Sequence, residues 1–223
     1  DVFFSGNENE IGRIAYQQAS GKFEIKTLKS NLSGNISDAI SLDYNCDGWN
    51  DLWIVCGGNS TDAAKKYLSR ILINNQKGDF IPLDTASFSH HSLAHCIAAS
   101  TKTSPDKTQY VFIGASITPG NYPDFPSQKL YQIDCGTVKD VTQLIETEGE
   151  SLGHIHTATW ADIDQDGKED LVLAGHWTSP LIFYQREGSF EKQILEEVIP
   201  NASLKGWWNS LYCVDLDGDG ILD

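Results

Sequence analysis

The sequence predicts an all-β protein in which small antiparallel sheets repeat along the chain, as in a β-propeller. Three observations support this prediction: an acidic nine-residue motif occurs three times, apolar strand-like segments flank each copy, and helical patterns are scarce. Equivalent positions of the repeat are Asp1, Asp51, Tyr110, Asp170 and Asp223, which lie 50 to 60 residues apart. Spacings of this length with several short strands per unit are typical of propellers and related arrays.

The acidic motif is D-x-[DN]-x-D-G-x-x-D, found as "DYNCDGWND" at 43–51, "DIDQDGKED" at 162–170 and "DLDGDGILD" at 215–223. Carboxylates this close together oppose folding unless a positive charge lies between them. Oxygen ligands on alternate residues, with glycine at the sixth position for the turn, suit calcium. We therefore expect two to three bound Ca²⁺ ions.

The expected calcium ligands are the side chains at motif positions 1, 3, 5 and 9 and the carbonyl group at position 7. The three sets are Asp43, Asn45, Asp47, Trp49 and Asp51; Asp162, Asp164, Asp166, Lys168 and Asp170; and Asp215, Asp217, Asp219, Ile221 and Asp223.

Two other interpretations of these loops compete with a calcium site in a β-sheet protein. An EF-hand needs a bidentate Glu at position 12 and flanking helices, but Ile54 and Leu173 stand there, inside β-rich runs. The second competing interpretation is a solvated acidic turn that binds no metal. The presence of three near-identical copies argues against it. Zinc and copper are disfavoured because the ligand positions contain neither thiolates nor imidazoles. The metal is expected to be structural, so chelation should lower thermal stability.

Each repeat unit is expected to be a four-stranded blade whose acidic loop joins the innermost strand to the second. The expected innermost strands are "ISDAISLD" (36–43), "LAHCIAAS" (93–100), "HTATWAD" (156–162) and "WNSLYCVD" (208–215). Outer hairpins are predicted at 13–23, 70–80, 129–138 and 181–190, where an apolar strand, a polar turn with glycine and a second strand follow one another. Short helical turns are expected only within 60–70 and 141–150.

The whole chain, residues 1–223, is interpreted as one propeller domain or a fragment of one. The approximate units are 1–50, 51–109, 110–169 and 170–223. In the third unit Tyr110 replaces the closing Asp and only Asp106 remains of the acids, so this unit is expected to bind no metal. The two chain ends either complete one blade of a closed four-bladed ring or belong to a larger propeller.

Composition restricts the possible partners. The formal net charge of −15 disfavours nucleic acid and anionic membranes, because phosphate binding uses clustered Lys and Arg. No apolar run is long enough to span a bilayer. The chain contains no Met, even at position 1, which indicates a piece of a larger protein. Its five cysteines have irregular spacings, so the pairing is undetermined, and isolated buried thiols are the favoured interpretation.

Histidines and tryptophans near the expected innermost strands form a possible ligand site. His154 and His156 lie two residues apart and are expected to point to one face, while His90, His91 and His95 occupy a similar place in the preceding unit. Converging imidazoles can bind a transition metal or act as acid and base. Trp207 and Asn209 precede the third loop and suit stacking on a sugar. The alternatives are ordinary polar residues at a channel mouth and packing between blades.

These motifs resemble the FG-GAP/VCBS repeat family of calcium-binding β-propeller blades. The segments "FIGASITPGNYPDFPSQKLYQ", "ATWADIDQDGKEDLVLAGHW" and "GWWNSLYCVDLDGDGILD" are similar to blades of the large VCBS-repeat proteins of Bacteroidetes, which often carry ASPIC/UnbV segments. The resemblance implies an exported, calcium-binding blade array that is part of a seven-bladed propeller and is located outside the cell or in the periplasm.

Two functions follow as expectations. The first is a non-enzymatic extracellular module that binds a protein or glycan partner or mediates adhesion at the cell surface. The second is a carbohydrate-active enzyme, a lyase or dehydratase, with a histidine centre at the channel. No nucleophile elbow, phosphate-cradling glycine loop or catalytic carboxylate pair outside the metal loops is present in the sequence. Propeller enzymes assemble their sites from different blades, so this absence does not separate the two functions.

Overall fold

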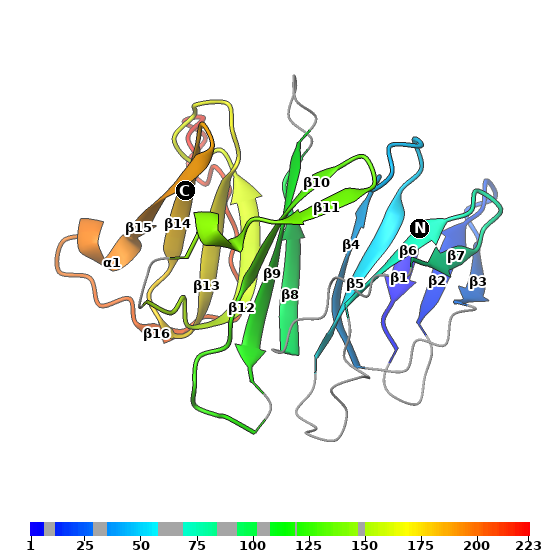
Figure 1. Cartoon of the computed structure of the whole chain (residues 1–223). Coiled ribbons are helices and arrows are strands. Elements are labelled where there is room, and N and C mark those ends of the chain that lie inside the picture. The colour runs from blue at the N-terminus through cyan, green and yellow to red at the C-terminus, as the bar shows by residue number, and fades with distance from the viewer. Residues whose placement is uncertain are drawn as a thin grey trace.

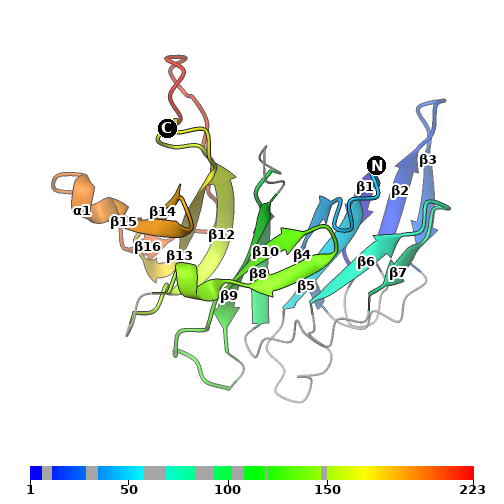
Figure 2. The ribbon, with the colours of Figure 1, turned by 45° about the horizontal axis from the view of Figure 1, so that its top comes forward.

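The structure is a computed structural model that describes residues 1–6, 12–28, 35–57, 69–83, 93–101, 108–118, 120–146 and 150–223. Four antiparallel sheets lie side by side in chain order, with the two termini at opposite ends of the array (Figures 1 and 2). The all-β prediction is confirmed. Among the described residues no strand pairing joins the first sheet to the last segment, so no closed ring forms.

Each sheet consists of strands that follow one another in the chain. Sheet A contains β1 (Val2–Phe4), β2 (Arg13–Gln17) and β3 (Phe23–Thr27), and sheet B contains β4 (Asn35–Leu42), β5 (Asp51–Gly57), β6 (Arg70–Asn74) and β7 (Phe80–Pro82). Sheet C contains β8 (Leu93–Ala99), β9 (Gln109–Ile117), β10 (Lys129–Asp134) and β11 (Thr137–Asp140). Sheet D contains β12 (His154–Ala161), β13 (Asp170–Thr178), β14 (Leu181–Arg186), β15 (Ser189–Ile194) and β16 (Gly206–Trp207).

The hydrophobic core lies between neighbouring sheets. Side chains on a strand alternate between its two faces, so the second strand of a blade contributes to two interfaces. In β5, Leu52 and Ile54 pack toward sheet A, whereas Trp53 and Val55 pack toward sheet C. The side chains of β9 are also divided between two interfaces, and Phe112 packs in the one between sheets C and D. Burial on both faces explains why these strands are continuously apolar.

The predicted hairpins are confirmed as β2–β3, β6–β7, β10–β11 and β14–β15. Three of the four expected innermost strands are confirmed as β4, β8 and β12. The predicted turn within 141–150 is a 3₁₀ helix at Thr142–Leu144, and a four-residue α1 spans Leu195–Val198. The expected turn at 60–70 lies almost entirely outside the described residues. None of the described helices is long and apolar enough to cross a bilayer.

The prediction of a fourth innermost strand at 208–215 is wrong. Only Gly206 and Trp207 form a strand, and they pair with the end of β13 in sheet D instead of starting another sheet. Residues 208–214 are extended without strand pairing, and Tyr212 is 86% exposed. A strand is stable only when it can pair and cover its apolar face, and no described strand offers this segment a partner.

The expectation of isolated thiols is wrong for two of the five cysteines. Cys46 and Cys135 form a disulfide that joins the first acidic loop to the β10–β11 turn of the next sheet, and the two cysteines are 89 positions apart in the chain. Cys56 and Cys96 are free and buried, as expected, and Cys213 is free and partly exposed. The partners are far apart in sequence, so only the packing of sheet B against sheet C brings them together.

Candidate functional site

The three acidic loops share one backbone conformation. The fourth residue of each motif has a left-handed φ, at 60° for Cys46, 60° for Gln165 and 81° for Gly218. The sixth residue is a glycine with φ of 85° to 87° in all three loops. This region is sterically costly for residues with a Cβ atom, which explains the invariant glycine of the motif. The repeat in sequence is therefore also a repeat in three-dimensional structure.

Hydrogen bonds within the loops repeat as well. The carboxylate at position 1 accepts the N–H of the glycine at position 6, at 3.1 Å for Asp43, 3.0 Å for Asp162 and 2.8 Å for Asp215. The carboxylate at position 5 accepts the N–H of position 7 at 2.8–2.9 Å in every loop. These bonds hold the alternate side chains on the inside of the turn.

Two loops bring three carboxylates close together. Ligand oxygens of Asp162, Asp164 and Asp166 all lie within 4.8 Å of one another, and so do those of Asp215, Asp217 and Asp223. In the first loop position 3 is an amide, and Asn45 donates to the Asp47 carboxylate at 3.1 Å. Oxygens at this separation match the ligand set that a hard cation requires.

One carboxylate oxygen in the second loop lacks a partner. Oδ1 of Asp162 is buried and accepts no hydrogen bond from protein, although its other oxygen accepts one from Gly167. A buried charged oxygen without a partner is energetically costly. Asp162 is one of the three residues in the Asp162, Asp164 and Asp166 cluster, so the residues present fit a cation bound there.

The closing residues of the loops have an additional structural role. Asp51 is 1% exposed, and its carboxylate accepts hydrogen bonds from the backbone N–H groups of Tyr44 and Asn74. Asp170 is 0% exposed, and its carboxylate accepts hydrogen bonds from the backbone N–H groups of Ile163 and Gln185. Each carboxylate thus ties its loop to the third strand of the same sheet. Burial raises the pKa of both groups, and these hydrogen bonds partly oppose the increase.

Two predicted ligands lie outside the carboxylate clusters. Asp170 is not part of the Asp162, Asp164 and Asp166 cluster, and Asp219 is not part of the cluster in the third loop.

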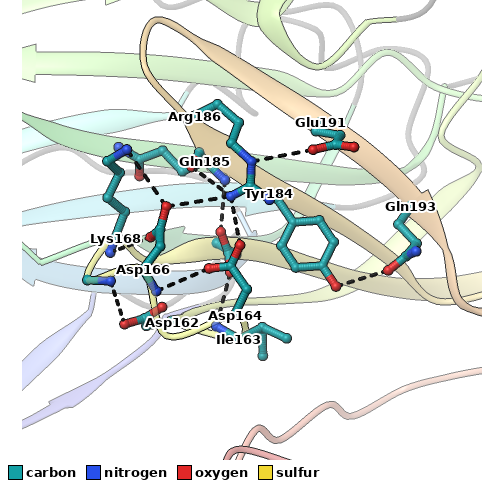
Figure 3. A network of polar contacts seen from close by, with 12 residues as sticks. Asp162, Ile163, Asp164, Asp166, Lys168, Tyr184, Gln185, Arg186, Glu191 and Gln193 are labelled. Carbon is teal, nitrogen blue, oxygen red and sulfur yellow. Dashed lines mark hydrogen bonds and ion pairs between the residues drawn. The ribbon is translucent and has the colours of Figure 1, made fainter.

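Two positive side chains approach the carboxylates of the second loop (Figure 3). Nη1 of Arg186, from β14, lies 2.8 Å from Oδ2 of Asp164 and 3.6 Å from Oδ2 of Asp166. Nζ of Lys168 lies 3.7 Å from the same Asp166 oxygen. In the first loop the side-chain amide of Gln76 donates to the Asp47 carboxylate at 3.4 Å.

The unit expected to lack metal has a different closing contact. Tyr110 occupies the position of Asp51 and Asp170, and its ring packs against Trp160 and Phe190. The Ser100 hydroxyl accepts the Tyr110 N–H at 2.9 Å. Asp106 lies outside the described residues.

A β-bulge occurs at the same place in each of the three innermost strands. The extra residues are Ser37 in β4, His95 in β8 and His156 in β12. A bulge leaves one residue unpaired and re-aims its side chain. The Ser37 hydroxyl donates to the carbonyl of Ala94 in the next sheet at 2.9 Å. Equivalent bulge residues of successive sheets are therefore close neighbours.

Three histidines form a contiguous row at this position. Nδ1 of His156 lies 3.1 Å from Nε2 of His95, and the two ring centroids are 4.2 Å apart. On its other side, His156 stacks on His176 of β13 with a centroid distance of 3.6 Å. His176 was not among the residues predicted from the sequence. It follows "LVLAG" directly, and pairing of the two strands that flank the second acidic loop places it opposite His154.

His154 does not join this row, which corrects the expectation that His154 and His156 point to one face. His154 is 2% exposed, and its Nδ1 lies 2.6 Å from the carbonyl oxygen of Ser116. Its ring packs against Tyr122 and Phe125. The bulge at His156 breaks the simple alternation of the strand, so the two imidazoles have different surroundings.

The structure brings Trp207 and Asn209 to the histidine row. The Trp207 ring stacks on His176 at 4.7 Å, and Oδ1 of Asn209 lies 2.8 Å from Nε2 of His176. Trp177 meets Trp207 edge to face at 5.2 Å, and both rings are more than half exposed. His90 and His91 lie outside the described residues.

Burial and neighbouring imidazoles keep His95 and His156 neutral. Burial lowers the pKa of His156 to about 4, and His95 and His176 add to the effect. The pKa of His95 is lowered by burial and by His176, while Asp38 opposes the shift. Both rings therefore have a free nitrogen lone pair at neutral pH.

Residues 162–223 match the FG-GAP-like repeat family. FG-GAP repeats are typical of β-propeller modules used in binding and adhesion, and they often bind Ca²⁺. The matched segment begins at the second acidic loop and ends with the third, so it includes β13 to β16 of sheet D and both carboxylate clusters. No curated protein matches the chain.

Proposed function

We infer that the chain is a calcium-stabilised β-propeller module that binds a protein or glycan partner outside the cell. The observation that carries this proposal is the buried, unpartnered Oδ1 of Asp162 within a cluster of three carboxylates. The FG-GAP-like repeat at 162–223 and the disulfide, which is typical of exported proteins, agree with it.

Calcium would act on the blades as a structural bridge. In the first two loops the position 1, 3 and 5 side chains would supply oxygen ligands, and in the third loop those of positions 1, 3 and 9 would do so. In each loop the carbonyl of position 7 would add another. The closing carboxylates of Asp51 and Asp170 already link the loops to the third strands. An ion in the loop would therefore stiffen the junction between the innermost strand and the rest of its sheet. A rigid scaffold of this kind presents its surface loops to a partner.

Calorimetric calcium titration combined with thermal unfolding tests this proposal. We expect the wild-type protein to bind two to three ions and its Tm to fall in EGTA. The Asp162→Ala and Asp43→Ala variants should each lose one ion. Asp124→Asn, a change in the Pro-rich loop away from the motifs, is the matched control. A Tm that EGTA leaves unchanged, with no calcium bound, would overturn the proposal.

Exposed aromatic rings support a glycan as the partner. Trp177 and Trp207 present their faces at one edge of sheet D, next to the side chains of His176 and Asn209. Aromatic faces beside polar groups suit stacking on sugar rings. A glycan array compared between wild type and Trp207→Ala tests this surface, with Trp49→Ala as a control at a distant loop.

A carbohydrate-active enzyme is the second candidate function, favoured by the neutral imidazole of His156 beside His95. A neutral imidazole has the free lone pair with which a general base takes a proton from a substrate carbon in a lyase or dehydratase reaction. Incubation with acidic polysaccharides, followed by the ultraviolet absorbance of unsaturated products, tests it. Activity that is lost in His156→Gln would favour the enzyme over the binding module.

A further inference from the structure

We propose that His95 and His156 form a binding site for one divalent transition-metal ion of the Zn²⁺, Ni²⁺ or Cu²⁺ class. The site lies at the boundary between sheets C and D, since β8 carries one ligand and β12 the other. It is separate from the acidic loops and goes beyond calcium-stabilised partner binding. Such an ion would join two neighbouring blades through their innermost strands.

The position of both ligands follows from the repeat. His95 and His156 are the bulge residues of their strands, as Ser37 is in β4. Two units therefore place an imidazole where the first unit has a hydroxyl that reaches the next sheet. Bulges occur often beside functional sites, because the extra residue directs its side chain away from the regular pleat.

The distance between the ligand nitrogens fits a shared ion. Metal–imidazole bonds of 2.0–2.1 Å place two adjacent ligand nitrogens about 2.9 Å apart at a right angle and about 3.4 Å apart at a tetrahedral angle. Nε2 of His95 and Nδ1 of His156 are 3.1 Å apart, between these limits. Two imidazoles with water in the remaining positions suit zinc, copper or nickel, whereas calcium prefers oxygen.

Neighbouring groups hold the ligand rings in place. Ser116 Oγ lies 3.5 Å from Nδ1 of His95, the nitrogen that faces away from His156. The His156 ring is stacked on His176, whose own orientation is fixed by Asn209. Contacts of this kind to the second nitrogen or the ring face orient metal-binding imidazoles.

The same two nitrogens form a hydrogen bond when no ion is present, with one ring as donor and the other as acceptor. For both to bind the ion, the donating ring moves its proton to its other nitrogen through solvent. Both rings then remain neutral, so the proton count is unchanged.

Copper binding followed by electron paramagnetic resonance tests the proposal on the whole chain. Millimolar Ca²⁺ is kept in the buffer to fill the acidic loops. One equivalent of Cu²⁺ with nitrogen hyperfine coupling is expected in the wild-type protein. The His95→Ala and His156→Ala variants should each lose this equivalent, while circular dichroism reports whether they remain folded. If either variant unfolds, His95→Gln or His156→Gln replaces it.

The His176→Phe variant is the matched control. It keeps an aromatic ring to stack on His156 and leaves both proposed ligands, so its nitrogen-coordinated copper should be retained. Loss of the copper signal in His95→Ala and His156→Ala but not in His176→Phe supports the site. Nitrogen-coordinated copper that is equal in all variants, or absent from the wild-type protein, would overturn it. Calcium binding by the acidic loops can be measured independently, so failure of one proposal is distinguishable from failure of the other.

Discussion

Cys46 and Cys135 are joined by a disulfide that fixes the first acidic loop to the β10–β11 turn of the neighbouring sheet. Two further contacts strengthen this junction: Gly136 donates its N–H to the Tyr44 carbonyl at 2.7 Å, and the Tyr44 hydroxyl donates to the Gly136 carbonyl at 2.5 Å. In the second loop, Gln165 occupies the position of Cys46 and donates to Gly220 of the third loop at 3.2 Å. The fourth residue of the motif thus links a loop to its neighbour in both cases.

Replacing both disulfide cysteines, Cys46→Ser with Cys135→Ser, should lower the free energy of unfolding by about 2–5 kcal/mol. The bridge constrains a long segment of the unfolded chain, and it holds the loop in the shape that brings its acids together. Denaturant unfolding in calcium and in EGTA measures the change. Cys213→Ser, at a free and partly exposed cysteine, should have little effect. Equal stability of the double variant and the wild type would contradict this prediction.

Arg186 is expected to substitute for part of the cation charge at the second loop. Its guanidinium lies 2.8 Å from Asp164, so Arg186→Gln should slightly lower stability in EGTA. The same change removes a competitor for the carboxylates, so the gain in Tm on adding calcium should increase. Lys129→Gln, which breaks the ion pair with Asp140 on sheet C, is the control and should leave the calcium response unchanged. A smaller calcium response in Arg186→Gln would contradict this role.

Gly175 in β13 lies against the bulged segment of β12. A Cβ atom added there would come within 1.9 Å of the His154 carbonyl oxygen, so the backbone of one strand would have to move. Gly175→Ala should therefore destabilise the protein by about 1–3 kcal/mol and disturb the contact between His95 and His156. Gly206→Ala, where the nearest atoms belong to the Trp208 side chain at 3.3 Å, is the milder comparison. Thermal unfolding of the two variants should differ clearly, and equal Tm values would contradict the prediction.

The sequence was sufficient to predict the features that depend on local pattern. The hairpins follow from apolar strands around glycine turns, and the loop shape follows from glycine at position 6 with acids on alternate residues. The boundaries of β4, β8 and β12 agree with the predicted innermost strands to within a few residues because each ends where an acidic or equivalent loop begins. Because the motif repeats, the strands and loops predicted in one unit agreed with those predicted in the others.

Features that depend on packing between sheets could not be predicted. The pairing of Cys46 with Cys135 requires the distance between two sheets, which no local pattern contains. The bulge at His156 cannot be recognised from strand periodicity, so His154 was wrongly placed beside it and His176 was missed. Residues 208–214 are rich in apolar and aromatic residues, as strands often are, but strand formation also needs a neighbouring strand.

The low pKa of His156 predicts acid sensitivity. Its pKa is about 4 in the folded protein, below the ordinary value of 6.5, because the ring is partly buried and faces His95, His176 and His154, while Asp38 acts on His95. The unfolded state therefore binds more protons between these pH values, and stability falls as pH decreases from about 6.5 toward 4. For a half-exposed ring we expect about 1 kcal/mol after solvent screening. Unfolding at pH 7.5 and pH 5 in chelator should show a smaller decrease for His156→Gln than for wild type. Protonation of the acidic loops contributes equally to both proteins, so parallel pH dependences would show that His156 does not titrate in this range.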